Sequence, residues 1–160
     1  MVRYQSITKT LQNSNNSCML ACIESFFSDL NTDMTQKEMI EKLLPDNLCD
    51  DQGYVLGKNI REVGKILGLN INKVKYHFPI NDKYADNSLF IGIDLSSVAP
   101  KEVKKQNNNR LHMVRYNRHI NDNEFIIMDP AGWFGLRIWN KEDLDKVYEE
   151  FLYVNIIERE

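Results

Sequence analysis

Cys18 is the residue whose type and position point most directly to chemistry. A polar run over residues 12–17 is followed by apolar residues at a helical period, which predicts a helix beginning at Cys18, with Asn16 or Ser17 as its N-cap. A thiol in a helix's first turn lies at the positive end of the helix dipole, which lowers its pKa and favours the nucleophilic thiolate. The alternative is an ordinary buried cysteine. By position, Cys22 is predicted to be a core residue and Cys49 an incidental thiol in a polar loop.

A thiolate nucleophile usually works with an imidazole. The chain has three histidines: His77, His112 and His119. If one strand turns through residues 119–122 and returns as the next, Arg118 would face Asn123, and by the same register His112 would face Asp129. Opposed side chains lie about 5 Å apart at Cβ, so the carboxylate could orient the imidazole. The alternative is a structural hydrogen bond at the sheet's end.

This register also sorts the neighbouring side chains into two faces. One face carries His112, Val114, Tyr116, Phe125, Ile127 and Asp129, and Arg115 falls on the other. A polar pair at the edge of an apolar face is typical of a site at the mouth of a cleft. Gln12, six residues before Cys18, could supply an amide donor to an oxyanion formed at that thiol.

The elements that must position these residues change in type near residue 70. Helices are predicted from Cys18, from Thr35 with Glu38 in a capping box, and over 57–67, where Ile66 is placed on the apolar stripe. Strands are predicted at 71–76, 89–93, 111–116, 125–128, 136–139 and 151–157, with a helix at 141–149 before the last strand. The sequence therefore predicts an α+β fold with an antiparallel sheet.

Composition fits one ordinary globular domain over residues 1–160, helical over about 12–68 and sheet-forming over about 70–157. The 160 residues carry a net charge of -3, with 42% hydrophobic and 27% charged residues, so no basic footprint for nucleic acid is present. Three cysteines without a CxxC pair fit neither a disulfide framework nor a zinc site, and favour a reducing compartment. No segment is expected to span a membrane or to act as a signal peptide. No metal or cofactor is expected.

Several segments together resemble the papain-like cysteine peptidases, nearest the bacteriocin-leader-processing (double-glycine) branch. The resemblance runs from Gln12 to about residue 156. It rests on Gln12, Cys18 and the helix after it, and on segments 89–93, 111–114 and 127–132. It implies a helical lobe that carries the nucleophile and packs on an antiparallel sheet lobe. It further implies Gln12 as oxyanion donor, Cys18 as nucleophile, His112 as general base and acid, and Asp129 as its orienting carboxylate.

Two departures from that branch bear on substrate. Met19 and Leu20 follow the cysteine where Gly-Pro is common, and no transporter segment is present, which argues against leader cleavage. The resemblance implies a thiol hydrolase acting on a protein or peptide, expected in the cytoplasm or delivered to a target cell as a bacterial effector or toxin. The alternatives are a glutamine deamidase, a transglutaminase-like acyl transferase, or a non-catalytic peptide-binding domain. An inhibitor or immunity protein stays open as a partner, whereas nucleic acid and membrane are not expected.

Overall fold

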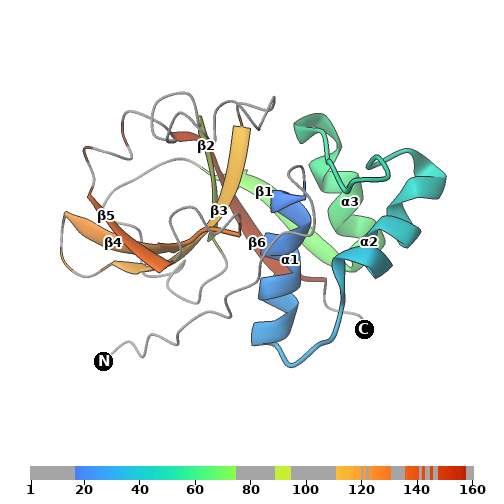
Figure 1. The fold of residues 1–160 in the computed structure, drawn as a ribbon, viewed down its shortest axis with the longest axis horizontal. Coiled ribbons are helices and arrows are strands. Elements are labelled where there is room, and N and C mark those ends of the chain that lie inside the picture. The colour runs from blue at the N-terminus through green and yellow to red at the C-terminus, as the bar shows by residue number, and fades with distance from the viewer. Residues whose placement is uncertain are drawn as a thin grey trace.

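A computed structural model describes residues 17–74, 89–94, 111–119, 121, 123–130, 136–140, 142, 145 and 148–157. Its helices are α1 (Cys18–Asp29), α2 (Gln36–Leu43) and α3 (Ile60–Leu67), with 3-10 turns at Leu44–Asp46 and Gly57–Asn59. Its strands are β1 (Leu69–Val74), β2 (Leu89–Asp94), β3 (Leu111–His119), β4 (Glu124–Met128), β5 (Leu136–Asn140) and β6 (Tyr148–Ile156). The α+β prediction is confirmed, with helices first and strands after (Figure 1).

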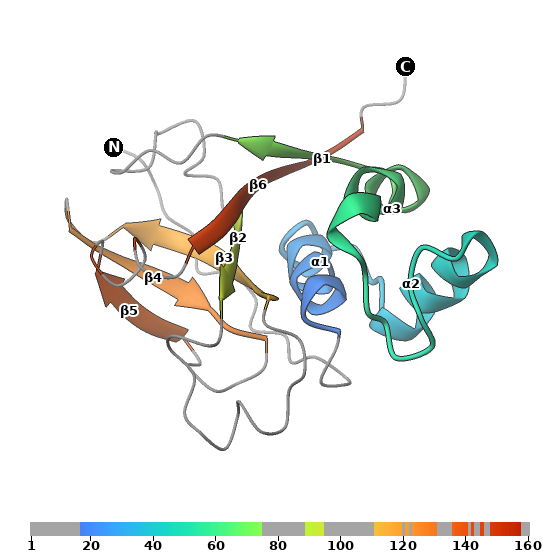
Figure 2. The ribbon, with the colours of Figure 1, turned by 90° about the horizontal axis from the view of Figure 1, so that it is seen from above.

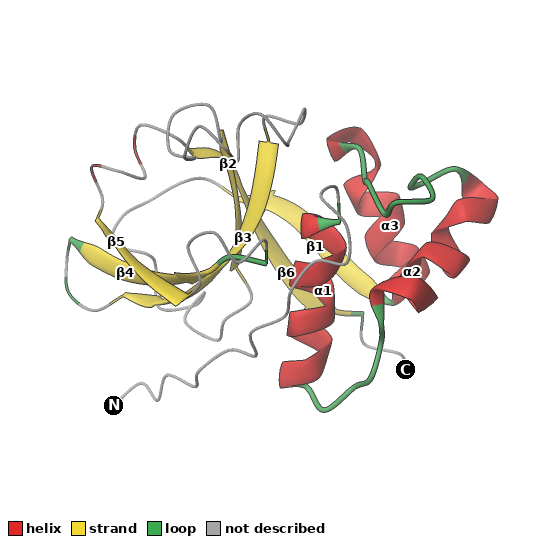
Figure 3. Ribbon diagram, viewed as in Figure 1, coloured by secondary structure: helices red, strands yellow, loops and turns green. Residues whose placement is uncertain are grey.

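The six strands form one sheet in the order β1-β6-β2-β3-β4-β5, and every neighbouring pair is antiparallel. The last strand in sequence therefore lies between the edge strand β1 and β2. Figure 3 shows the helices gathered at one side of the molecule and most of the sheet at the other. The sheet places β3, which carries the predicted histidine, next to β4, which the predicted aspartate directly follows.

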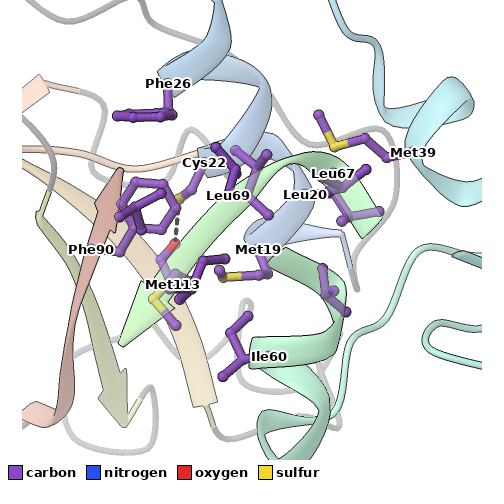
Figure 4. Close-up of a cluster of buried hydrophobic side chains, with 14 of the residues drawn as sticks. Met19, Leu20, Cys22, Phe26, Met39, Ile60, Leu67, Leu69, Phe90 and Met113 are labelled. Atoms are coloured by element: carbon purple, nitrogen blue, oxygen red, sulfur yellow. Dashed lines mark hydrogen bonds between the residues drawn. The ribbon is translucent and has the colours of Figure 1, made fainter. Parts of the chain in front are cut away.

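Helix α1 lies between β3 and α2, as the view in Figure 2 makes plain. Contacts on opposite sides explain why most of its residues are buried rather than a single stripe. Its side chains join α2, α3 and the sheet in one hydrophobic core, drawn in Figure 4. A helix held from both sides has a well-defined position, and this helix begins at the predicted nucleophile.

Local sequence signals account for how α2 and α3 begin and end. Thr35 caps α2 by accepting a hydrogen bond from the backbone N–H of Glu38 at 3.1 Å, as the capping-box pattern predicts. Gly68 ends α3 with φ of 80°, a left-handed conformation that glycine adopts without steric cost. The predicted apolar stripe of α3 is wrong at Ile66, which is 40% exposed, because α3 packs on β1 with a narrower face.

The predicted helix over residues 141–149 is wrong at its end. Tyr148 already belongs to β6, which pairs with β2 there. Glu142 and Asp145 are helical, and the other residues of that predicted helix before Tyr148 lie outside the described residues. Among the helices in the described ranges, none has the length and apolar character needed to cross a bilayer.

Candidate active site

Cys18 is the first residue of α1, as predicted, and is half-buried. Ser17 occupies the N-cap position but makes no side-chain cap, which corrects the expectation that its hydroxyl would cap the helix. That hydroxyl instead donates to Oε1 of Gln36 at 3.0 Å, and the Gln36 amide donates to Glu24 at 2.8 Å. The residue before the thiol is thus tied to α2. With no side-chain cap there, the positive end of α1 faces the thiol.

His112 and Asp129 lie together at the ends of neighbouring elements. His112 is the second residue of β3, and Asp129 directly follows β4. Nε2 of the imidazole is 2.5 Å from Oδ1 of Asp129, and both side chains are fully buried. Since Nε2 is engaged by the carboxylate, Nδ1 is the ring nitrogen left for the hydrogen bond with Cys18. The structure therefore brings Cys18, His112 and Asp129 into one chain of contacts.

The hairpin register that predicted this contact is wrong by two residues. Arg118 opposes Ile126 rather than Asn123, an offset of three, and a bulge between Tyr116 and Arg118 reduces the offset to two, so that Tyr116 opposes Ile127 rather than Phe125. A shift of two keeps every side chain on its face, so His112 and Asp129 become diagonal neighbours on the same face instead of direct partners. Diagonal Cβ atoms lie about 7–8 Å apart, a gap that these two side chains can span.

Opposing influences act on the pKa of both reacting groups. Burial alone would raise the pKa of Cys18, but the hydrogen bond and charge of His112, helped by hydrogen bonds from the backbone of Met113 and Met19, bring it below its ordinary value. Burial alone would lower the pKa of His112, but Asp129 and Cys18 raise it to about 9. Both shifts act in the direction of a thiolate beside an imidazolium, the pair needed for thiol attack on a carbonyl.

The other two cysteines lie in the core. Cys22 is fully buried, as predicted, and its thiol donates to the carbonyl of Met113 at 3.5 Å, drawn as a dashed line in Figure 4. Burial, followed by the nearby charge of Cys18, raises its pKa well above the ordinary value. Cys49 was expected in a polar loop, but it is 8% exposed and packs in the hydrophobic core, and burial raises its pKa. Both thiols are therefore held in the unreactive, protonated form.

Several predicted residues lie outside the described part of the chain. Gln12, the expected oxyanion donor, is among them, as is His77. His119 was expected in the turn, but it is the last residue of β3 and opposes Phe125. Among the described residues, no cluster of three or more histidine, cysteine or carboxylate side chains has the arrangement of a metal site.

Two buried polar residues were missed by sequence reasoning. Gln36, the first residue of α2, holds Ser17, and Arg115 on β3 holds the far end of α1. Neither has a local signal, because a glutamine in a first helical turn and an arginine in a strand are both commonly exposed. For Arg115, the sequence indicates only that alternation along β3 places it on the face opposite His112, and this does not predict its burial.

The fold is similar to that of solved peptidase domains. The peptidase domain of Streptococcus ComA, a bi-functional ABC transporter involved in a quorum-sensing pathway, matches with a TM-score of 0.68 at 18% sequence identity, covering 94% of this chain and 98% of that domain. The peptidase domain of Streptococcus mutans ComA gives TM-scores of 0.58 in complex with a small-molecule inhibitor and 0.56 in a second structure. These two cover 92% of this chain and 98% of that domain, at 17% and 16% identity. No protein-family model and no curated protein sequence matches the chain. The chain therefore has the papain-like α+β fold of the ComA peptidase domains.

Proposed function

We propose that the protein is a cysteine peptidase of the double-glycine peptidase type, in which Cys18 is the nucleophile. The observation that carries this proposal is the convergence of a thiol at a helix start, a buried imidazole and a buried carboxylate. A cysteine that only packs in the core would not require an imidazole that is hydrogen-bonded to a carboxylate. The similarity in fold to peptidase domains supports the same reading from a separate direction.

Each of the three residues has a defined step in the proposed reaction. The Cys18 thiolate attacks the carbonyl carbon of the scissile amide, and the carbonyl electrons move to oxygen. His112 then gives its proton to the leaving nitrogen as the C–N bond breaks, which leaves a thioester on Cys18. His112 next takes a proton from water, whose oxygen attacks the thioester, so that the carboxylic acid leaves and the resting pair reforms. Asp129 holds the imidazole in one tautomer and orientation throughout.

Stabilisation of the oxyanion comes from the start of α1. The backbone N–H of Cys18 lies at the positive end of the helix, where developing negative charge is favoured. The Gln12 side chain is the proposed second donor, on the basis of its spacing to Cys18. Loss of one such donor typically lowers the rate by about 10²–10³.

The proposed substrate is a peptide or a protein segment. The same three residues would also support deamidation of glutamine or transfer of its acyl group, because these reactions differ from peptide hydrolysis only in the amide attacked and the group that resolves the thioester. The chemical change in the substrate therefore separates them: a new N-terminus, a one-dalton conversion of Gln to Glu, or a cross-link.

Mass spectrometry of a bacterial cell extract treated with the purified protein tests the proposal. We expect new peptide N-termini with the wild-type protein and with Cys49→Ala, the control that removes a thiol away from the site. Cys18→Ala and His112→Ala are expected to abolish them. Deamidated glutamine would instead favour the deamidase alternative, and cross-linked glutamine would favour the acyl-transferase alternative. Substrate that is bound but chemically unchanged would contradict an enzymatic role and favour the peptide-binding alternative.

A further inference from the structure

Arg115 is a fully buried cation that joins β3 to α1. Its Nη1 donates to the hydroxyl of Ser25 and to Oδ2 of Asp29, both at 2.7 Å. The guanidinium carbon also lies 5.8 Å from the ring centroids of Phe26 and Phe90, which are labelled in Figure 4. Both hydrogen-bond acceptors belong to α1, so all of this side chain's described polar contacts cross from the strand to the helix.

Three contacts between α1 and β3 follow one another in the same direction along both elements. Cys18 meets His112, Cys22 meets Met113, and Ser25 with Asp29 meets Arg115. The four helix residues are spaced by four, three and four, so they lie on one face of α1. From Cys18 to Ser25 the helix rises about 10.5 Å, and from His112 to Arg115 the strand advances about 10 Å. The two spacings are similar, so the first and third contacts, although made from opposite faces of β3, both depend on the position of α1 along the strand.

Stability alone is a weak reason for a buried ion pair at this position. Removing two charges from water is costly, and well-packed apolar residues of similar volume are often as stabilising or more so. Apolar contacts, however, tolerate small displacements, whereas hydrogen bonds to Ser25 and Asp29 are directional. Two directional bonds from one nitrogen restrict both the rotation of α1 about its axis and its position along β3.

We infer that Arg115 is a positioning residue for the proposed peptidase reaction, since its bonds to Ser25 and Asp29 set the distance between Cys18 and His112. The inference rests on the proposed function. A slip of α1 by one residue moves its start by about 1.5 Å and turns it by about 100°. A misplacement of about 1 Å can lower an enzymatic rate by about 10². Arg115 acts through the helix, because its hydrogen bonds to Ser25 and Asp29 both end on α1.

The test is the pH dependence of Cys18 alkylation by iodoacetamide, followed by mass spectrometry in full-length Arg115→Met and Asp29→Asn variants. This reaction reports the thiolate of Cys18 and requires no substrate. His112 acts directly on that thiolate, with Asp129 behind it and Cys22 one helical turn away. We expect the apparent pKa of Cys18 to rise by about one unit or more in both variants, because each loosens the thiol from its imidazole.

The two variants separate positioning from simple charge. Loss of a cation would raise the pKa of Cys18, whereas loss of an anion would lower it, so opposite shifts in Arg115→Met and Asp29→Asn would overturn the inference. Unchanged values in both would also overturn it. Asp29→Asn keeps the size of a side chain that is 18% exposed, so this variant is expected to fold. The test can therefore still be made if Arg115→Met does not fold.

A core variant outside the hydrogen bonds between α1 and β3 controls for general loss of stability. Val154→Ala truncates a buried residue of β6 that pairs with Ile71, and it is expected to lower the melting temperature without moving the pKa of Cys18. If it moves that pKa as far as the Arg115 variant does, the positioning role is refuted. A wild-type Cys18 with an ordinary pKa contradicts the proposed function itself. A lowered wild-type value that neither variant changes refutes only the role of Arg115.

Discussion

Replacing Asp129 with asparagine is expected to lower the pKa of His112 from about 9 toward its ordinary 6.5, with Cys18 left as the group that raises it. The side chain keeps its shape but loses the charge that holds the imidazolium, while burial continues to favour the neutral ring. At pH 7.5 a pKa of about 9 leaves about 97% of the imidazole protonated, and a pKa of 6.5 leaves about 10%. The proton that the leaving group needs would thus be present less often, with about a tenth of the wild-type fraction as the limit.

Nuclear magnetic resonance of the histidine rings measures this directly. With only three histidines in the chain, His112 can be assigned from the signal that disappears in His112→Gln. The signals of His77 and His119 are recorded in the same spectra. The reasoning is refuted if His112 titrates near 6.5 in the wild type, or if its midpoint is the same with asparagine at position 129.

Three further predictions concern stability. In Cys18→Ala, Asp129 still raises the pKa of His112 but Cys18 no longer does, so the free energy of unfolding should fall above pH 6.5 by less than the roughly 3 kcal/mol that a folded-state pKa of about 9 would give. This stability is complete below pH 6.5 and is lost as pH rises through the folded-state pKa. Gly53→Ala should cost about 1–2 kcal/mol in urea unfolding, because φ is 83° and the new Cβ would lie 3.2 Å from the Ser17 side chain. Thr35→Ala should cost about 1 kcal/mol by the same measurement, through loss of the α2 cap.

Each of these predictions has a matched comparison. Adding Asp129→Asn to Cys18→Ala should flatten the pH profile of stability, and an equally steep profile would assign it to other groups. Gly57→Ala places a Cβ in open space and should be near neutral, so equal losses at Gly53 and Gly57 would exclude the proposed crowding. Thr32 is exposed and outside any helix, so Thr32→Ala should cost less than Thr35→Ala.

Features set by nearby residues could be predicted from the sequence. The start of α1 at Cys18 follows from a polar run before an apolar period, and the start of α2 from the spacing of Thr35 and Glu38. The end of α3 at Gly68 and the positions of the six strands have equally local causes, glycine at a left-handed position and alternating or apolar runs. The two residues of the His112–Asp129 contact were also identified, because the face of a strand depends only on alternation.

Features set by distant partners could not be predicted. The hairpin register was wrong because Asn121 accepts hydrogen bonds from the backbone of Asn123 and Glu124, which forms a side-chain-supported turn. The bulge between Tyr116 and Arg118 in β3, equally hidden in the sequence, then reduces the offset from three residues to two. Burial of Cys49 and Arg115 depends on what packs over them, and their own neighbours in sequence do not reveal it. The predicted contact between His112 and Asp129 was still correct because a register error of two residues leaves each side chain on the same face of the sheet.

The most direct test of the central claim is the rate of alkylation of each cysteine by iodoacetamide at neutral pH, in the wild type and in His112→Ala. If Cys18 is a thiolate paired with His112, it should react much faster than Cys22 and Cys49, and that preference should collapse when the imidazole is removed. Equal rates at the three thiols, or a preference for Cys18 that His112→Ala leaves unchanged, would contradict the proposed active site.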